Sequence, residues 1–187
     1  MVVRKVIALL AEGVRDGAAA RAASDSLYTE RKGKVSSTLN ILSVDMQTQT
    51  LVITRNNPAP VLLAQNGELN ELNDKSLPVG LYRDTRPQIF ETKLQAGLTA
   101  VAYTDGLVHA GSRNSLSLNV PDEVTELIKT PDQSAQVIAD SLLERAMDLD
   151  QGRPVDDTSV AVLRVLDQAS DSVRRMAVRI PLEPQYY

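Results

Sequence analysis

The sequence predicts an α+β domain, with mainly antiparallel sheets and helices packed outside them. Most apolar, β-branched segments are joined by short polar turns, which is typical of antiparallel strands. Two later stretches repeat apolar residues at helical spacing instead. The 187 residues are 43% hydrophobic and 24% charged, which fits one folded domain with a modest core.

The first two elements are predicted to be a strand and a helix. Residues 2–10 form an apolar run rich in Val and Ile, which favours a buried strand. A turn with Gly13 and Gly17 follows. The Ala-rich segment 18–28 then predicts a helix with Asp16 as its N-cap.

The middle of the chain is predicted to consist of strands and turns. Residues 38–45 and 50–55 flank a polar turn and predict a hairpin. Further strands are expected at 60–64, 69–72, 88–94 and 98–104. Because 98–103 (LTAVAY) is nearly all apolar, this strand is expected to be central and buried on both faces.

The last part of the domain is predicted to hold two helices and one strand. The helices are expected at 121–129 and 134–149, and the strand at 155–166. We therefore assign residues 1–166 to one domain. Residues 167–187 form a C-terminal extension, in which 175–182 is a candidate edge strand.

Composition excludes several classes of function. The chain has no Cys and a single His, which rules out disulfides, thiolate metal sites and a His-rich zinc site. Aromatics are 3% and the net charge is -4 without a basic stripe, so nucleic acid is not the expected partner. No apolar run approaches the length of a membrane span, so we expect no membrane association and a cytoplasmic location.

Acidic residues recur where predicted strands end. Glu12 follows the first strand, Asp105 follows the central strand, and Asp156 and Asp157 lie at the last one. Converging carboxylates repel unless a cation lies between them, and Mg²⁺ and Mn²⁺ prefer oxygen ligands. Asp and Gly are also common in ordinary turns, so the residues alone leave both interpretations open.

Five short segments, in order, resemble motifs of the bacterial SpoIIE/RsbU/RsbX-like branch of the PPM (PP2C-type) serine/threonine phosphatases. Residues 11–17 are similar to the A-D-G-x-G-x-G metal loop, 56–63 to A-G-H-x-P-x-L-L, 76–80 to L-P-[LV]-G, 103–110 to Y-T-D-G-[LV]-x-E-A, and 156–164 to the closing D-D-x-[TS] strand. The shared order makes chance agreement a poor explanation.

The resemblance implies a PP2C-like αββα sandwich of two mainly antiparallel sheets flanked by helices. It also implies two Mn²⁺ or Mg²⁺ ions at one end, where a metal-bound water attacks phosphorus. Carried over by position, Glu12 would bridge the metals and the Gly13 carbonyl would bind one ion. Asp105 and Asp156 would bind the other ion, and Gly106 would keep the backbone close to the site.

The implied activity is that of a metal-dependent protein serine/threonine phosphatase. Its implied substrate is phosphoserine or phosphothreonine on a bacterial regulatory protein of the anti-sigma-factor antagonist type. Two alternatives stay open. The chain could be a catalytically degenerate PPM-like module that binds a regulatory partner, or a piece of a longer protein whose further strand supplies another ligand.

Several positions depart from the family pattern. Glu12 stands where the family has Asp, no earlier strand with a Gly-Asp ligand precedes it, and one helix is expected where the family has a pair. Arg15 could hold a phosphate bidentately or be a solvated surface residue. His109 replaces Glu and is expected at the surface, and Asn57 replaces His and is expected to form a turn before Pro58.

Overall fold

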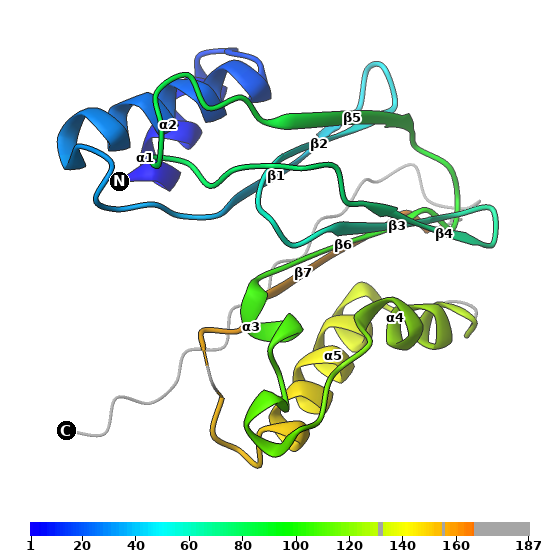
Figure 1. Cartoon of the computed structure of the whole chain (residues 1–187). Helices are drawn as coiled ribbons and strands as arrows, with labels where there is room; N and C mark the ends of the chain where they lie inside the picture. The colour runs from blue at the N-terminus through cyan, green and yellow to red at the C-terminus, as the bar shows by residue number, and fades with distance from the viewer. Residues whose placement is uncertain (131–132, 155, 167–187) are drawn as a thin grey trace, which may run out of the picture.

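The computed structural model describes residues 1–130, 133–154 and 156–166, and these form four stacked layers (Figure 1). The helices are α1 (Val2–Ala11), α2 (Asp16–Arg31), α3 (Asp105–Val108), α4 (Val120–Ile128) and α5 (Ala135–Leu149), with a 3₁₀ turn at Ser112–Asn114. The strands are β1 (Leu39–Asp45), β2 (Thr50–Asn56), β3 (Val61–Gln65), β4 (Glu68–Leu72), β5 (Gln88–Lys93), β6 (Thr99–Tyr103) and β7 (Val160–Arg164).

The two middle layers are antiparallel sheets. One sheet has the order β1-β2-β5 and the other the order β4-β3-β6-β7. All five residues of β6 are buried, as expected for the central strand. At the other extreme, β5 is an edge strand on which Ile89 and Phe90 are exposed. The predicted sandwich of two antiparallel sheets flanked by helices is confirmed.

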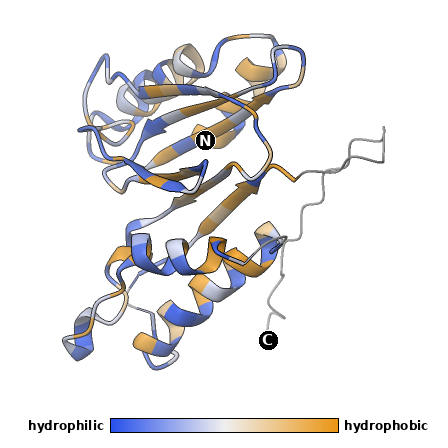
Figure 2. Ribbon diagram, turned by 90° about the vertical axis from the view of Figure 1, so that its right-hand side faces the viewer, coloured by the Kyte–Doolittle hydropathy of each residue, from blue (hydrophilic) through white to orange (hydrophobic). Residues whose placement is uncertain are grey.

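Three apolar clusters hold the layers together. One lies between the sheets and includes Leu51, Ile53 and Leu63. A second joins the four-stranded sheet to α4 and α5, and a third joins the three-stranded sheet to α1 and α2. Figure 2 shows the strands coloured mostly hydrophobic and the connecting loops mostly hydrophilic. Among the described residues, no helix combines the length and apolar character needed to cross a membrane.

The predicted strand at 2–10 is wrong, because this segment is helix α1. Val6 is buried, and Val2 and Leu10 pack half-buried beside it against α2 and β1. This spacing of four residues is a helical stripe. A short apolar run does not separate a buried strand from a helix. The chain therefore has two helices, α1 and α2, where one helix was expected.

Two further predictions need correction. Arg15 is the N-cap of α2 and Asp16 is its first residue, with no side-chain capping bond. The last strand is Val160–Arg164 rather than 155–166, because the residues just before it form a loop with its own side-chain hydrogen bonds. The extension 167–187 and its candidate edge strand at 175–182 lie outside the described residues.

Candidate functional site

Asp105 and Asp156 lie at one lip of the four-stranded sheet, where β6 ends and β7 begins. The pairing between these strands continues one residue beyond β6. The Thr104 amide donates to the Ser159 carbonyl at 3.1 Å, and the Ser159 amide donates to Thr104 Oγ1 at 2.9 Å. Asp105 starts α3, and both aspartate side chains are exposed. Asp105 thus follows β6 and Asp156 precedes β7, on two segments that these hydrogen bonds hold side by side.

Gly106 lets the segment before β7 lie directly against α3. A Cβ atom at Gly106 would come within 2.6 Å of the Asp157 carbonyl oxygen and 2.8 Å of Thr158 Oγ1. Thr104 Oγ1 also donates to the Asp157 carbonyl at 3.0 Å. A close backbone approach is therefore present at Gly106, and its neighbour is the chain around Asp157.

Asn57 fixes the end of β6 from the opposite side. Its buried side chain donates through Nδ2 to the Tyr103 carbonyl at 3.0 Å, and its Oδ1 accepts from the Ala59 amide at 3.0 Å. The predicted turn at Asn57 is therefore confirmed, and the residue also holds the backbone two positions before Asp105. Burial and the negative charge of Glu71 raise the pKa of Tyr103 to about 12.

Arg55 braces the same turn from the interior. It is only 2% exposed and donates to the carbonyl oxygens of Asn57 at 2.7 Å, Ala59 at 3.4 Å, and Asp74. Burial lowers the pKa of Arg55, and the carboxylate of Asp74 opposes that shift. A single buried guanidinium thus ties the β2–β3 turn to the chain after β4.

The loop at 76–80 is held to the same turn and to α2. Three hydrogen bonds do this: Ser76 Oγ to the Arg55 carbonyl at 2.8 Å, Asn56 Nδ2 to the Leu77 carbonyl at 3.0 Å, and the Gly80 amide to Ser24 Oγ at 3.0 Å. Gly80 has φ +84°, and a Cβ atom there would meet the Leu27 side chain at 2.4 Å. Glycine is therefore required at this position.

Glu12 is not brought to Asp105 and Asp156. It is the C-cap of α1, and the residues after it connect α1 to α2. In Figure 1 these helices lie on the outer face of the three-stranded sheet, whereas α3 lies beyond the other sheet. The prediction that Glu12 ends a strand beside other acids is wrong. Gly13 and Arg15 lie in the same connection between α1 and α2.

The described residues do not complete the two-metal centre that the resemblance implies. Within residues 1–130, 133–154 and 156–166, no three His, Cys, Asp or Glu side chains gather closely enough to hold a metal ion. Asp105 and Asp156 supply two carboxylates, and Asp156 Oδ1 already accepts from the Asp157 amide at 2.8 Å. Mg²⁺ is commonly held by one or two carboxylates together with waters and phosphates.

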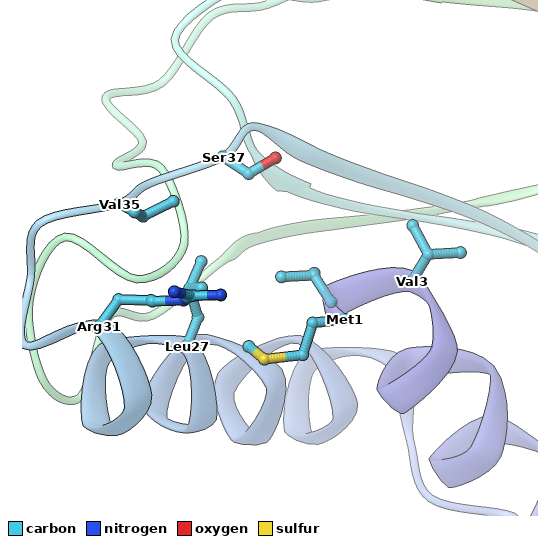
Figure 3. A pocket seen from close by; sticks show the side chains of 7 residues that line it. Met1, Val3, Leu27, Arg31, Val35 and Ser37 are labelled. Atoms are coloured by element: carbon cyan, nitrogen blue, oxygen red, sulfur yellow. The ribbon is translucent and has the colours of Figure 1, made fainter.

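A separate hollow of about 570 Å³ lies between the start of α1, the end of α2 and the segment leading into β1 (Figure 3). Its lining is Met1, Val2, Val3, Leu27, Arg31, Val35 and Ser37. No carboxylate lines it, so it offers no ligand for a hard cation. The lip at Asp105 therefore remains the candidate for chemistry.

His109 is exposed at the C-cap of α3, as predicted. Sequence reasoning missed Arg55 and the long-range contact of Asn57. The available signal for Arg55 was a charged residue inside an otherwise apolar strand, directly before two asparagines. For Asn57, the partner Tyr103 is 46 residues away, and spacing along the chain does not reveal it.

Comparisons with known proteins agree on one family. The family described as Stage II sporulation protein E (SpoIIE) matches residues 1–166. The stage II sporulation protein E of Bacillus subtilis (strain 168) is 21% identical over 157 residues, covering 84% of this chain. The match covers only 19% of that relative, so this chain spans about a fifth of its length.

Solved structures share the fold at low sequence identity. The PP2C phosphatase domain of SpoIIE from Bacillus subtilis, solved with a fragment of its regulatory domain, has a TM-score of 0.73 and 19% identity, over 88% of this chain and 48% of that one. The catalytic domain of the phosphatase PstP, in complex with two manganese ions, has a TM-score of 0.64 and 17% identity, over 89% and 81%.

The RsbU and RsbW domains of a Mycobacterium tuberculosis protein give a TM-score of 0.67 and 16% identity, over 86% of this chain and 45% of that one. The family match thus extends to the end of the described part of the chain and includes both sheets and the lip at Asp105. The chain belongs to the SpoIIE family and has the fold of a PP2C-type phosphatase domain.

Proposed function

We propose that this chain is a metal-dependent protein serine/threonine phosphatase that hydrolyses phosphoserine or phosphothreonine on a bacterial regulatory protein. The proposed substrate is of the anti-sigma-factor antagonist type, and the proposed location is the cytoplasm. The observation that carries the proposal is the junction of β6, α3 and β7, which puts Asp105 and Asp156 at one lip. Membership of the SpoIIE family supports it.

The proposed contribution of this chain is a pair of carboxylates for Mn²⁺ or Mg²⁺. Two exposed aspartates at one lip repel each other, and a divalent cation between them would remove that repulsion. The remaining ligands of a two-ion centre would come from residues outside the described ones or from a second polypeptide. The close backbone approach at Gly106 and the hydrogen bond from Asn57 would hold the two aspartates in fixed positions relative to each other.

The direct test is hydrolysis of p-nitrophenyl phosphate and of a phosphoserine peptide, with and without Mn²⁺. We expect metal-dependent turnover that Asp105→Asn removes. Asp148→Asn, which changes an exposed aspartate on α5, is the matched control and should keep the activity. Turnover equal in the Asp105→Asn variant and the unmodified chain would reject the proposal.

A second candidate function is a catalytically degenerate module that binds a regulatory partner. The observation that favours it is the lack of a third ligand beside Asp105 and Asp156 in the described part of the chain. Calorimetric titration with Mn²⁺ separates the two. Tight binding of two ions argues against a degenerate module, and no binding together with no turnover argues for it.

A further inference from the structure

A second hollow, of about 370 Å³, lies beside the loop that follows β4. Its lining residues are Lys75, Leu77, Tyr82, Arg83, Asp84, Thr85 and Arg86, and we name it the basic hollow. Three of these side chains are cationic and one is anionic. This local excess of positive charge stands out in a chain whose net charge is -4.

The cations of the basic hollow have no acidic partners inside the described part of the chain. None of Lys75, Arg83 and Arg86 forms a salt bridge there, and all three are exposed. The Arg83 guanidinium lies 5.4 Å from the centre of the Tyr28 ring, within the range of a cation–π contact. Unpaired cations in one concave site attract an anionic ligand.

Three hydrogen bonds hold the loop that lines the basic hollow. The Asp84 amide donates to Asp25 Oδ1 at 2.9 Å, and the buried Thr85 donates through its hydroxyl to the Tyr82 carbonyl at 2.9 Å. Gln88 Nε2 donates to the Lys75 carbonyl at 3.1 Å. These bonds limit the conformational freedom of the loop backbone, so its ordering costs less when a ligand binds.

The basic hollow is also tied to the lip at Asp105. Asn56 donates to the carbonyl of Leu77, which lines the hollow, and the next residue, Asn57, donates to the carbonyl of Tyr103 at the end of β6. Two consecutive side chains thus link one site to the other.

We propose that the basic hollow docks an acidic segment of the phosphorylated protein substrate, next to the residue that is dephosphorylated. Lys75, Arg83 and Arg86 bind the carboxylates of that segment. Leu77 and Tyr82, which are 39% and 56% exposed, contact its apolar side chains. This inference rests on the proposed function, and it adds a specificity determinant outside the proposed centre.

Binding of a probe peptide tests the docking without catalysis. The probe is a fluorescein-labelled phosphoserine peptide flanked by glutamates, and the comparison peptide has glutamines in their place. We expect Arg83→Glu with Arg86→Glu to weaken binding of the acidic peptide about tenfold, as close charge pairs do. The glutamine peptide should bind weakly to all variants.

Two control variants make the result specific. Arg4→Glu with Arg21→Glu makes the same charge change on exposed residues of α1 and α2, and it should leave binding unchanged. Lys75→Glu leaves the Arg83–Tyr28 contact in place, and it should also weaken binding of the acidic peptide. Three results would overturn the proposal. The first is equal affinity for the two peptides, and the second is an equal loss of peptide binding in both double variants. The third is binding of the unmodified chain to anionic lipid vesicles without binding to the acidic peptide.

Kinetics separate a failure of docking from a failure of the proposed function. If docking is correct, Arg83→Glu with Arg86→Glu lowers kcat/KM for the acidic phosphopeptide and leaves p-nitrophenyl phosphate hydrolysis unchanged. If the unmodified chain hydrolyses neither substrate, the proposed function fails, and peptide binding still decides whether the hollow docks an acidic segment.

Discussion

Replacing Gly106 with alanine should separate the 156–159 segment from α3. The new Cβ atom would be 2.6 Å from the Asp157 carbonyl oxygen and 3.0 Å from the Asp157 carbonyl carbon. Both are backbone atoms, which cannot turn away as a side chain does. The loop must therefore move, and with it the hydrogen bonds from Thr104 Oγ1 to the Asp157 carbonyl and from the Ser159 amide to Thr104 Oγ1.

The size of the effect follows from three contributions. Overpacking costs ~1–3 kcal/mol, and each weakened hydrogen bond costs ~1 kcal/mol. Alanine regains up to ~1 kcal/mol of helix propensity, less in a helix as short as α3. We expect Gly106→Ala to lower the free energy of unfolding by ~3 kcal/mol. For a chain of this length that corresponds to a fall of ~6–12 °C in Tm.

The matched control is Gly17→Ala, also in the first turn of a helix. There the added Cβ atom meets Ile89 Cδ1 at 2.5 Å, which is the end of a side chain that is 58% exposed and free to rotate. Urea denaturation should place this variant within ~0.5 kcal/mol of the unmodified chain, or above it. If Gly106→Ala proves as stable as Gly17→Ala, the backbone contact does not exist as described.

Two other substitutions test the surroundings of the lip. Asn57→Ala should cost ~2 kcal/mol in urea denaturation, because the buried Tyr103 carbonyl loses its side-chain donor; a loss under ~0.5 kcal/mol would contradict that role. The raised pKa of Tyr103, about 12 against an ordinary 10.0, predicts that stability falls as pH rises above 10.0, since the unfolded chain loses this proton first. Urea midpoints followed through this range should fall less for Tyr103→Phe, and identical slopes would argue against the shift.

Local patterns predicted most of the sheet elements. The hairpin of β1 and β2 follows from a short polar turn between two β-branched segments, and its register runs from Leu39 opposite Asn56 to Asp45 opposite Thr50. The predicted helices at 121–129 and 134–149 are present as α4 and α5, and they begin at the side-chain caps Asn119 and Ser134. These signals act within a few residues, so one sequence is enough to read them.

The start of the chain could not be predicted in this way. Residues 2–10 are apolar at nearly every position, so periods of two and of 3.6 residues both fit. The choice of helix depends on packing of Val6 against α2 and β1, which is a tertiary effect. The same error placed Glu12 at a strand end and so added a third acid to the predicted metal site.

In the candidate site, too, local patterns identified the residues, whereas contacts between distant segments were not predicted. Asp105 and Asp156 were found because each follows or precedes a strand that the sequence identifies. The contacts that hold the lip in place were not found, because Asn57 and Thr104 bond to residues 46 and 53 to 55 positions away. Such partners depend on the sheet order, which turn chemistry does not fix.

The exposed edge strand β5 can promote self-association of this protein at high concentration. In the part of the chain that the structure describes, no strand covers its outer edge, so its free main-chain groups offer a template to any extended chain. The exposed side chains of Ile89 and Phe90 would add apolar contacts to such pairing. Glu91 and Lys93 lie on the same strand, and their charges oppose pairing with another chain. High salt screens these charges and would therefore favour self-association through this edge.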